Sequence, residues 1–164
     1  MVLYFIRHGE AGTVAPSDFE RTLTMHGKAE ADGVGRALKL LVGRAHSIFA
    51  SPIIRAQQTA SIIRSHLGTA PIEPCEHLTP GADPRNLFAE LKHCTNDSNV
   101  LLVGHEPFLS TCVSTLVSGQ SDARILFRPA TVACVSVGPV IERGAGRLDW
   151  LMNAEQMARL APGT

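Results

Sequence analysis

The sequence predicts an α/β fold in which a mostly parallel sheet lies between two layers of helices. Short runs of β-branched and aromatic residues alternate with segments of helical periodicity, which is typical of parallel strands joined by crossover helices. The 164 residues are 45% hydrophobic and 18% charged, a composition typical of a folded α/β protein. No repeat or linker interrupts this alternation, so we expect one domain over residues 1–164.

The first elements are the most regular. Val2–Arg7 is a short apolar run and predicts a buried strand. Thr24 is a suitable N-cap for a helix over residues 24–42, in which apolar residues recur three and four positions apart. Ser47–Ala50 predicts a second short strand.

A second helix is expected after this strand. Ser51 is expected to cap it, with Pro52 at its first position, where a missing N–H costs nothing. Gly68 is well placed to end it. An extended piece over residues 72–75 and a turn rich in proline and glycine follow.

The second half of the chain continues the alternation. A third helix is expected to begin at Asp83, a central strand to cover residues 99–103 and a fourth helix to cover residues 107–117. Residues 131–137 and 147–151 predict a hairpin at one edge of the sheet. No element is assigned to the last dozen residues.

Charge and hydropathy limit the classes of partner. Fifteen basic residues balance fifteen acidic ones, which gives no general reason to expect nucleic acid or a membrane surface as a partner. The first apolar run ends at Arg7, too early for a secretory signal, and no run approaches the roughly 20 residues that span a bilayer. We therefore expect a cytoplasmic protein, monomeric by default.

Cysteine and histidine spacing argues against a metal centre. The four cysteines form no CxxC pair and are expected to be reduced thiols: Cys75, Cys94, Cys112 and Cys134. None of the seven histidines has metal-type spacing such as HExxH. We expect neither a metal nor an organic cofactor.

Basic side chains follow three predicted strands. Arg7 and His8 end the first, Arg55 lies one helical turn beyond the second, and His105 follows the central strand. Because the carboxyl ends of parallel strands meet at one edge of a sheet, these side chains are expected to converge there. Two arginines and two histidines at one edge predict an anionic substrate.

Phosphoryl transfer suits these residue types. A neutral imidazole is a good nucleophile towards phosphorus, and guanidinium groups bind phosphoryl oxygens with paired N–H donors. A second histidine adds a donor to the oxygens on which charge grows. Gly9 lets the backbone come close to His8, so that a carbonyl contact fixes the tautomer of the ring.

Four motifs in order resemble the histidine phosphatase superfamily, which includes phosphoglycerate mutases and acid phosphatases. They are Arg7-His8-Gly9, Leu23-Thr24-x-x-Gly27-x-x-x-Ala31, Ser51-Pro52-x-x-Arg55-Ala56-x-x-Thr59 and Val103-Gly104-His105-Glu106-Pro107. The short chain and the turn Leu78-Thr79-Pro80-Gly81 look most like the SixA branch, the bacterial phosphohistidine phosphatases. The resemblance implies a phosphoglycerate mutase-like fold.

The resemblance also implies roles for residues. His8 would accept the phosphoryl group, and Arg7, Arg55 and His105 would bind it. Arg21 lies in a segment that resembles a substrate-proximal loop, and with Gly9 it completes the expected substrate-binding set.

The general acid of larger relatives has no clear counterpart, although Glu76 and His77 are candidates. An imidazole leaves phosphorus more easily than an alkoxide and needs less help from an acid, so this gap favours phosphohistidine as the substrate. We expect that substrate on a partner protein, such as a phosphotransfer domain or a phosphocarrier. Two alternatives stay open: a phosphatase of small phosphate esters, and a catalytically silent phosphate-binding module.

Overall fold

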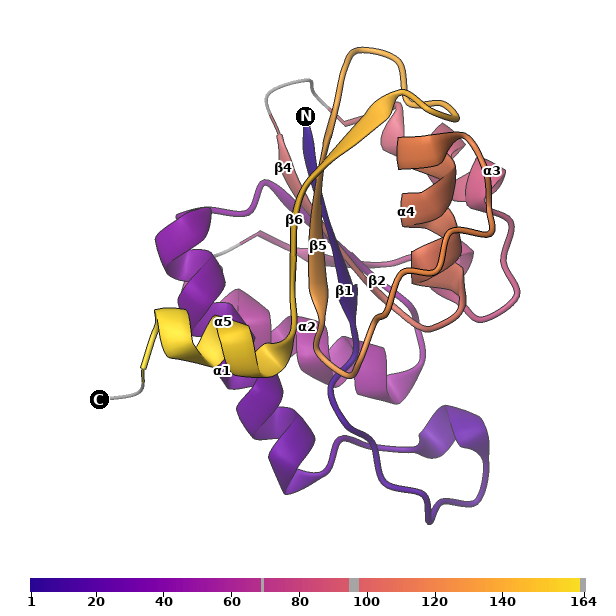
Figure 1. The fold of residues 1–164 in the computed structure, drawn as a ribbon. Helices are drawn as coiled ribbons and strands as arrows, with labels where there is room; N and C mark the ends of the chain where they lie inside the picture. Colours follow the sequence, from indigo (N-terminus) through magenta and orange to yellow (C-terminus); the bar gives the residue numbers. More distant parts are fainter. Residues whose placement is uncertain (69, 95–97, 163–164) are drawn as a thin grey trace.

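The computed structural model describes residues 1–68, 70–94 and 98–162, and its centre is a six-stranded sheet (Figure 1). The strands lie in the order β3-β2-β4-β1-β5-β6. The first four are parallel to one another, and β5 and β6 form the antiparallel edge. Their bounds are β1 (Val2–Arg7), β2 (Ser47–Ala50), β3 (Ile72–Pro74), β4 (Asn99–Gly104), β5 (Val132–Val137) and β6 (Gly146–Met152). The predicted α/β class and edge hairpin are confirmed.

Helices cover both faces of this sheet. Helices α3 and α4 pack on one face, and α1, α2 and α5 pack on the other (Figure 1). The helices are α1 (Met25–Leu41), α2 (Ile54–Leu67), α3 (Pro84–Leu91), α4 (Phe108–Ser118) and α5 (Ala154–Leu160), with short 3₁₀ turns η1 (Asp18–Glu20) and η2 (Glu76–Leu78). The three-layer prediction is therefore confirmed.

Strand β1 shows how the sequence builds two cores at once. Leu3 and Phe5 point into the core under α3 and α4, whereas Tyr4 and Ile6 point into the core under α1 and α2. Alternation with period two sends successive side chains to opposite faces. Each fully buried side chain of this size stabilises the fold by roughly 1.5–3 kcal/mol, so β1 is held firmly on both faces.

Two predicted helix boundaries are confirmed by their caps. The Thr24 side chain accepts a hydrogen bond from the Gly27 N–H at 3.0 Å, at the start of α1. Gly68 follows α2 with a φ of 106°, in the region that favours glycine.

The predicted cap of α2 is wrong. The N-cap is Ile53, whose φ and ψ are extended, and the helix begins at Ile54 rather than at Pro52. The reason is that the Ser51 hydroxyl bonds to His105 instead of capping a helix. This correction moves Ser51 from a structural role to the site described below.

The helix α5 had no counterpart in the sequence prediction. It begins with a capping box, in which Asn153 and Gln156 each bond to the backbone of the other. Met157 is its one buried side chain among seven residues, so its apolar periodicity is weak. The capping box was the only local signal for it.

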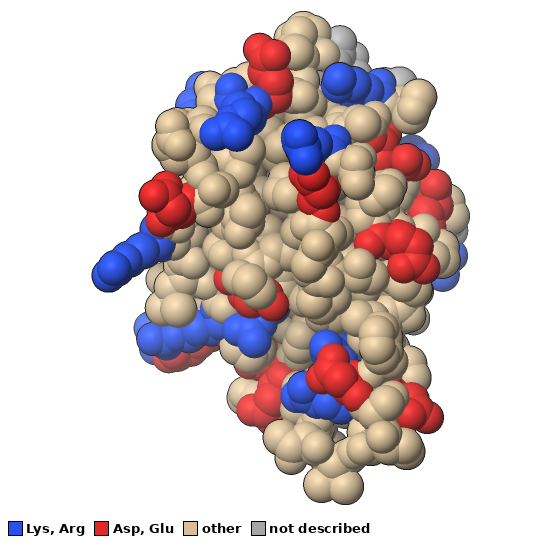
Figure 2. All heavy atoms as spheres, turned by 90° about the vertical axis from the view of Figure 1, so that its right-hand side faces the viewer, with Lys and Arg blue, Asp and Glu red and all other residues tan. Residues whose placement is uncertain are grey.

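The surface has mixed charge. On the face shown in Figure 2, basic and acidic side chains are interspersed.

None of the helices described is long and apolar enough to cross a membrane. Within the described ranges, no group of three histidine, cysteine or acidic residues could hold a metal ion. All four cysteines are free, and Cys75, Cys112 and Cys134 are buried.

Candidate active site

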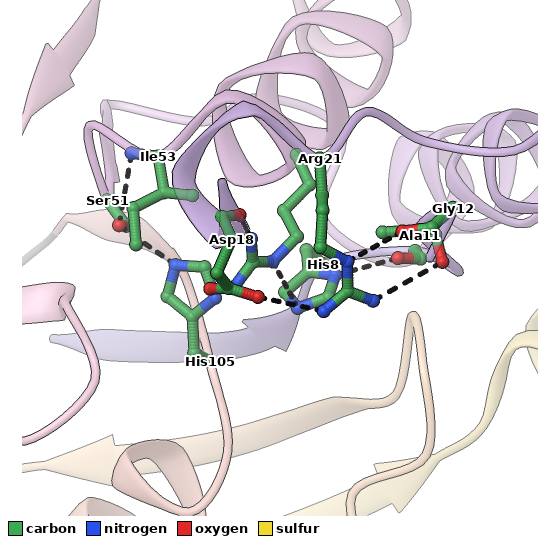
Figure 3. Close-up of polar contacts among 10 residues, drawn as sticks. His8, Ala11, Gly12, Asp18, Arg21, Ser51, Ile53 and His105 are labelled. Carbon is green, nitrogen blue, oxygen red and sulfur yellow. Dashed lines mark hydrogen bonds and ion pairs between the residues drawn. The ribbon is translucent and has the colours of Figure 1, made fainter. Parts of the chain in front are cut away.

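The ends of β1 and β4 bring His8 and His105 together. The two strands pair in parallel with Arg7 opposite Gly104, so the residue after each strand reaches the same edge. Figure 3 shows His8 and His105 near each other. Their ring centroids are 5.0 Å apart, and Arg55 Nε donates to His8 Nε2 at 3.2 Å. Of the four residues predicted for the phosphate site, Arg55 and His105 thus both lie against His8.

His8 is held as a neutral nucleophile. Its Nδ1 lies 2.7 Å from the Gly9 carbonyl oxygen, which accepts a hydrogen bond from the Nδ1–H. The lone pair of Nε2 is therefore free to accept from Arg55. Burial, together with the neighbouring guanidinium groups, lowers the pKa of His8 to about 4. At neutral pH the ring has the protonation state that attack on phosphorus requires.

Two glycines permit the close backbone approach around His8. A Cβ on Gly9 would lie 2.5 Å from the Gly27 carbonyl oxygen, and a Cβ on Gly27 would lie 2.0 Å from that of Glu10. The Gly9 N–H donates to the Thr59 hydroxyl at 3.1 Å, one helical turn beyond Arg55. Loop and helix are thereby fixed around the histidine.

His105 is buried and has one free donor position. Its Nε2 lies 2.9 Å from the Ser51 hydroxyl, whereas its Nδ1 is buried without a hydrogen-bond partner. Burial, followed by the charges of His8 and Arg55, lowers the pKa of His105 to about 3. When Ser51 donates to Nε2, the proton of the neutral ring is on Nδ1, ready for an oxygen of a ligand.

Arg7 presents a second free donor. Its Nη1 donates to the Phe127 carbonyl at 2.7 Å, and its Nε is buried without a partner. Burial lowers the pKa of Arg7, but an arginine stays charged at neutral pH. Among the described residues, three buried side-chain atoms have no hydrogen-bond partner: Arg7 Nε, His105 Nδ1 and Thr131 Oγ1.

Arg21 reaches the site through a residue that the sequence analysis missed. It donates to the Gly12 carbonyl at 2.6 Å and to the Asp18 carboxylate at 2.9 Å. Asp18, which Figure 3 shows beside His8 and Arg21, in turn accepts from Arg55. No periodicity or motif distinguishes Asp18 in the sequence, because it lies in an irregular segment.

The two candidate acids lie apart from these contacts. Glu76 is exposed and His77 is half-buried, both in η2. This turn borders the end of β4, since a Cβ on Gly104 would lie 3.1 Å from the Leu78 carbonyl oxygen. Among the described hydrogen bonds, none joins either side chain to His8, so the structure does not bring them to the nucleophile.

Two cavities flank this edge of the sheet. One, of about 330 Å³, is lined by Thr13, Ala15, Ser17, Asp18 and Arg21, and so leads to Arg55 through Asp18. The larger, of about 530 Å³, lies between α1, α5 and residues 128–129, and none of the predicted site residues lines it. The smaller cavity is the relevant one, because Asp18, one of its lining residues, accepts from Arg55.

Comparison with known proteins places the chain in a family. The family model described as the histidine phosphatase superfamily (branch 1) matches residues 3–79. Phosphohistidine phosphatase SixA of Escherichia coli (strain K12) is 30% identical over 156 residues, which cover 93% of this chain and 94% of the relative.

Solved structures agree with this match. A structure of the protein histidine phosphatase SixA complexed with tungstate has a TM-score of 0.85 and 29% identity, covering 94% of this chain and 97% of that one. A structure described as a putative alpha-ribazole-5'-P phosphatase, from Escherichia coli str. K-12 substr. MG1655, has a TM-score of 0.76. At 18% identity, with 94% and 98% of the two chains covered, it shows a shared fold alone.

Proposed function

Because the chain belongs to the histidine phosphatase superfamily, in its SixA-like branch, and is a phosphatase, we propose that it hydrolyses phosphohistidine on a partner protein. The reaction proceeds through a phosphohistidine intermediate on His8. The single observation that carries this proposal is the surrounding of His8 Nε2. Nε2 keeps its lone pair, which accepts from Arg55 until a phosphoryl group replaces that contact, and Arg7 Nε and His105 Nδ1 are buried without partners.

The first step forms one bond and breaks one. His8 Nε2 attacks phosphorus, and the P–N bond to the substrate imidazole breaks. The donors of Arg7, Arg55 and His105 bind the equatorial oxygens, where charge develops in the transition state. The departing imidazole takes a proton from solvent. Water then attacks phosphorus, and inorganic phosphate leaves as neutral His8 is restored.

Among the described residues, no hydrogen bond or ion pair joins the Glu76 or His77 side chain to His8, Arg55 or His105, so no contact fixes either as a general acid, which supports a P–N substrate. An alkoxide needs a proton as it leaves, whereas a histidine imidazole departs with less help. Glu76 and His77 stay candidates for the general acid, since η2 borders the end of β4.

Exposed apolar side chains support a protein as the carrier of the phosphoryl group. Val14 and Phe19 are 98% and 66% exposed in the segment that contacts Arg55, and Leu126 is 66% exposed beside the carbonyl that binds Arg7. Large apolar side chains at the edge of a site are typical of a surface that binds another protein. The four free cysteines are consistent with the reducing cytoplasm as the place of this reaction.

The test compares three classes of substrate. A phosphorylated phosphotransfer domain, free phosphohistidine and alkyl phosphate esters are incubated with the wild type, and released phosphate is measured. We expect kcat/KM for the phosphorylated domain to exceed that for the esters by at least about 100-fold, and His8→Ala to abolish release. His93→Ala is the matched control, because His93 is exposed and lies two residues beyond the end of α3.

Two results would overturn the proposal. Faster turnover of esters than of either phosphohistidine substrate would assign the protein to small-molecule metabolism. Binding of phosphate without release from any substrate would identify a silent binding module.

A further inference from the structure

Asp18 occupies the donors that a phosphoryl group would use. Arg55 Nη1 donates to the Asp18 backbone carbonyl at 2.6 Å, and Nη2 donates to the carboxylate at 2.9 Å. Arg21 Nη1 donates to the other carboxylate oxygen at 2.9 Å. With Arg55 Nε on His8, every nitrogen of this buried guanidinium has a partner. In Figure 3 the Asp18 carboxylate lies among His8, His105 and Arg21.

The carboxylate has the shape and charge to stand in for phosphate. Its two oxygens accept from two arginines, as two phosphoryl oxygens would. A phosphoryl group with both arginines on its oxygens therefore cannot bind until Asp18 leaves.

The segment that carries Asp18 has few buried contacts that would hold it against Arg55. The 3₁₀ turn η1 has no buried residue, and the Asp18 side chain is 57% exposed. A segment with few buried contacts opens at a low free-energy cost. The released carboxylate would pass directly into water.

We propose that Asp18 is a displaceable placeholder that makes the phosphate site selective for doubly charged phosphoryl groups. A phosphoryl group carries between one and a half and two negative charges at neutral pH and can replace a carboxylate on two arginines. A singly charged anion has no such advantage. The proposal rests on the proposed function only in requiring that Arg55 and Arg21 bind phosphate.

The alternative role for Asp18 is that of a proton donor. Hydrogen bonds from Arg21 and Arg55 hold the pKa of Asp18 below its ordinary value. The group is therefore ionised at neutral pH and has no proton to give to a leaving group. A placeholder needs the ionised form.

Inhibition by inorganic phosphate tests the placeholder. Asp18→Asn keeps the shape but replaces charge-assisted hydrogen bonds by weaker neutral ones, so we expect the inhibition constant to fall about fivefold to tenfold. Glu20→Gln is the matched control. It removes the same charge from the same turn, but the Glu20 carboxylate accepts from Ser17, and no described hydrogen bond or ion pair joins it to the Arg21 or Arg55 side chain. We expect it to change the constant by less than about twofold.

Hydrogen exchange gives a second readout that a general charge effect would not move. Saturating tungstate should speed amide exchange over residues 13–21 in the wild type, because the anion releases the segment. Asp18→Asn should exchange rapidly there without tungstate. Equal inhibition constants for Asp18→Asn and Glu20→Gln, or slower exchange with tungstate, would overturn the placeholder.

Two further outcomes separate this inference from the proposed function. A large loss of ester turnover in Asp18→Asn with an unchanged inhibition constant would make Asp18 a proton donor and contradict the placeholder. Failure of phosphate and tungstate to bind either protein would overturn the phosphate site itself. A preference for esters would refute the proposed substrate but leave the phosphate comparison valid.

Discussion

The two sides of His8 are built in opposite ways. On the sheet side, His8, Ser51 and His105 are 8%, 0% and 2% exposed, and their positions are fixed by the ends of strands. On the other side, residues 11–22 include no buried residue, and Arg21 and Asp18 tie that segment to Arg55. The buried side can hold the catalytic groups in place, and the exposed side can change its conformation when a substrate binds.

Arg55 belongs to both sides, so its loss should have the largest effect. Arg55→Ala removes the contacts to His8 Nε2 and to Asp18 together, and we expect kcat/KM to fall by about 10²–10³-fold. Arg55→Lys keeps the charge but loses the planar pair of donors, and should recover only part of that loss. Arg85→Ala, at an exposed arginine that pairs with Asp83, should match the wild type in the same assay. A mild effect of Arg55→Ala would mean that the two sides work separately.

The junction of the two sides at Gly27 tests how firmly the sheet side is held. In Gly27→Ala the new Cβ would overlap the Glu10 backbone, and we expect a loss of about 1–3 kcal/mol in the free energy of unfolding. Gly33→Ala in the same helix has room, with Ala158 Cβ at 3.4 Å, and should be neutral or stabilising. Urea unfolding of both variants measures the difference. Equal stability of the two variants would contradict the close approach of Gly27 to the Glu10 backbone.

Ser51 tests the positioning of His105 from the sheet side alone. Ser51→Ala leaves both ring nitrogens of His105 without partners, and we expect kcat to fall about tenfold with a smaller change in KM. Ser51→Thr retains the hydroxyl and should restore most of the rate. Ser65→Ala, at an exposed serine of α2, is the control. An unchanged kcat would show that the hydroxyl is not needed to hold the ring.

Phe19 tests the adaptable side. If the exposed segment contacts the carrier protein, Phe19→Ser should raise KM for a phosphorylated phosphotransfer domain about fivefold and leave free phosphohistidine unaffected. Leu40→Ser removes an equally exposed apolar side chain, 69% exposed in the last turns of α1, and should change neither. Equal effects on both substrates would place Phe19 outside the protein contact.

Stability gives a separate test of the sheet side, through a pH dependence that comes from the two histidines. Their ordinary pKa is about 6.5, and the fold lowers it to about 4 for His8 and about 3 for His105. Below pH 6.5 the unfolded state therefore binds protons that the folded state does not, and the free energy of unfolding falls as the pH drops towards 4. His8→Asn/His105→Asn should have a flatter profile between pH 6.5 and 4. An unchanged slope of the free energy of unfolding against pH would contradict the burial of His8 and His105 as neutral side chains.

The same contrast explains what the sequence could predict. The strands and most helices follow from short-range apolar patterns, and the strand ends place Arg7, His8 and His105 by topology. Asp18 lies in a segment without periodicity and is recognised only from its contacts to Arg21 and Arg55. Ser51 was misassigned because a serine before a proline is a good helix cap, and only the folded structure shows that its hydroxyl faces His105.

Trapping the phosphorylated enzyme tests the central claim most directly. The wild type and His8→Ala would be mixed with a ³²P-labelled phosphotransfer domain, quenched within milliseconds and digested. A phosphoryl group that is labile in acid and stable in alkali should be found on the peptide containing His8, and none should be found in the variant. Label on another residue, or full turnover by His8→Ala, would contradict the mechanism.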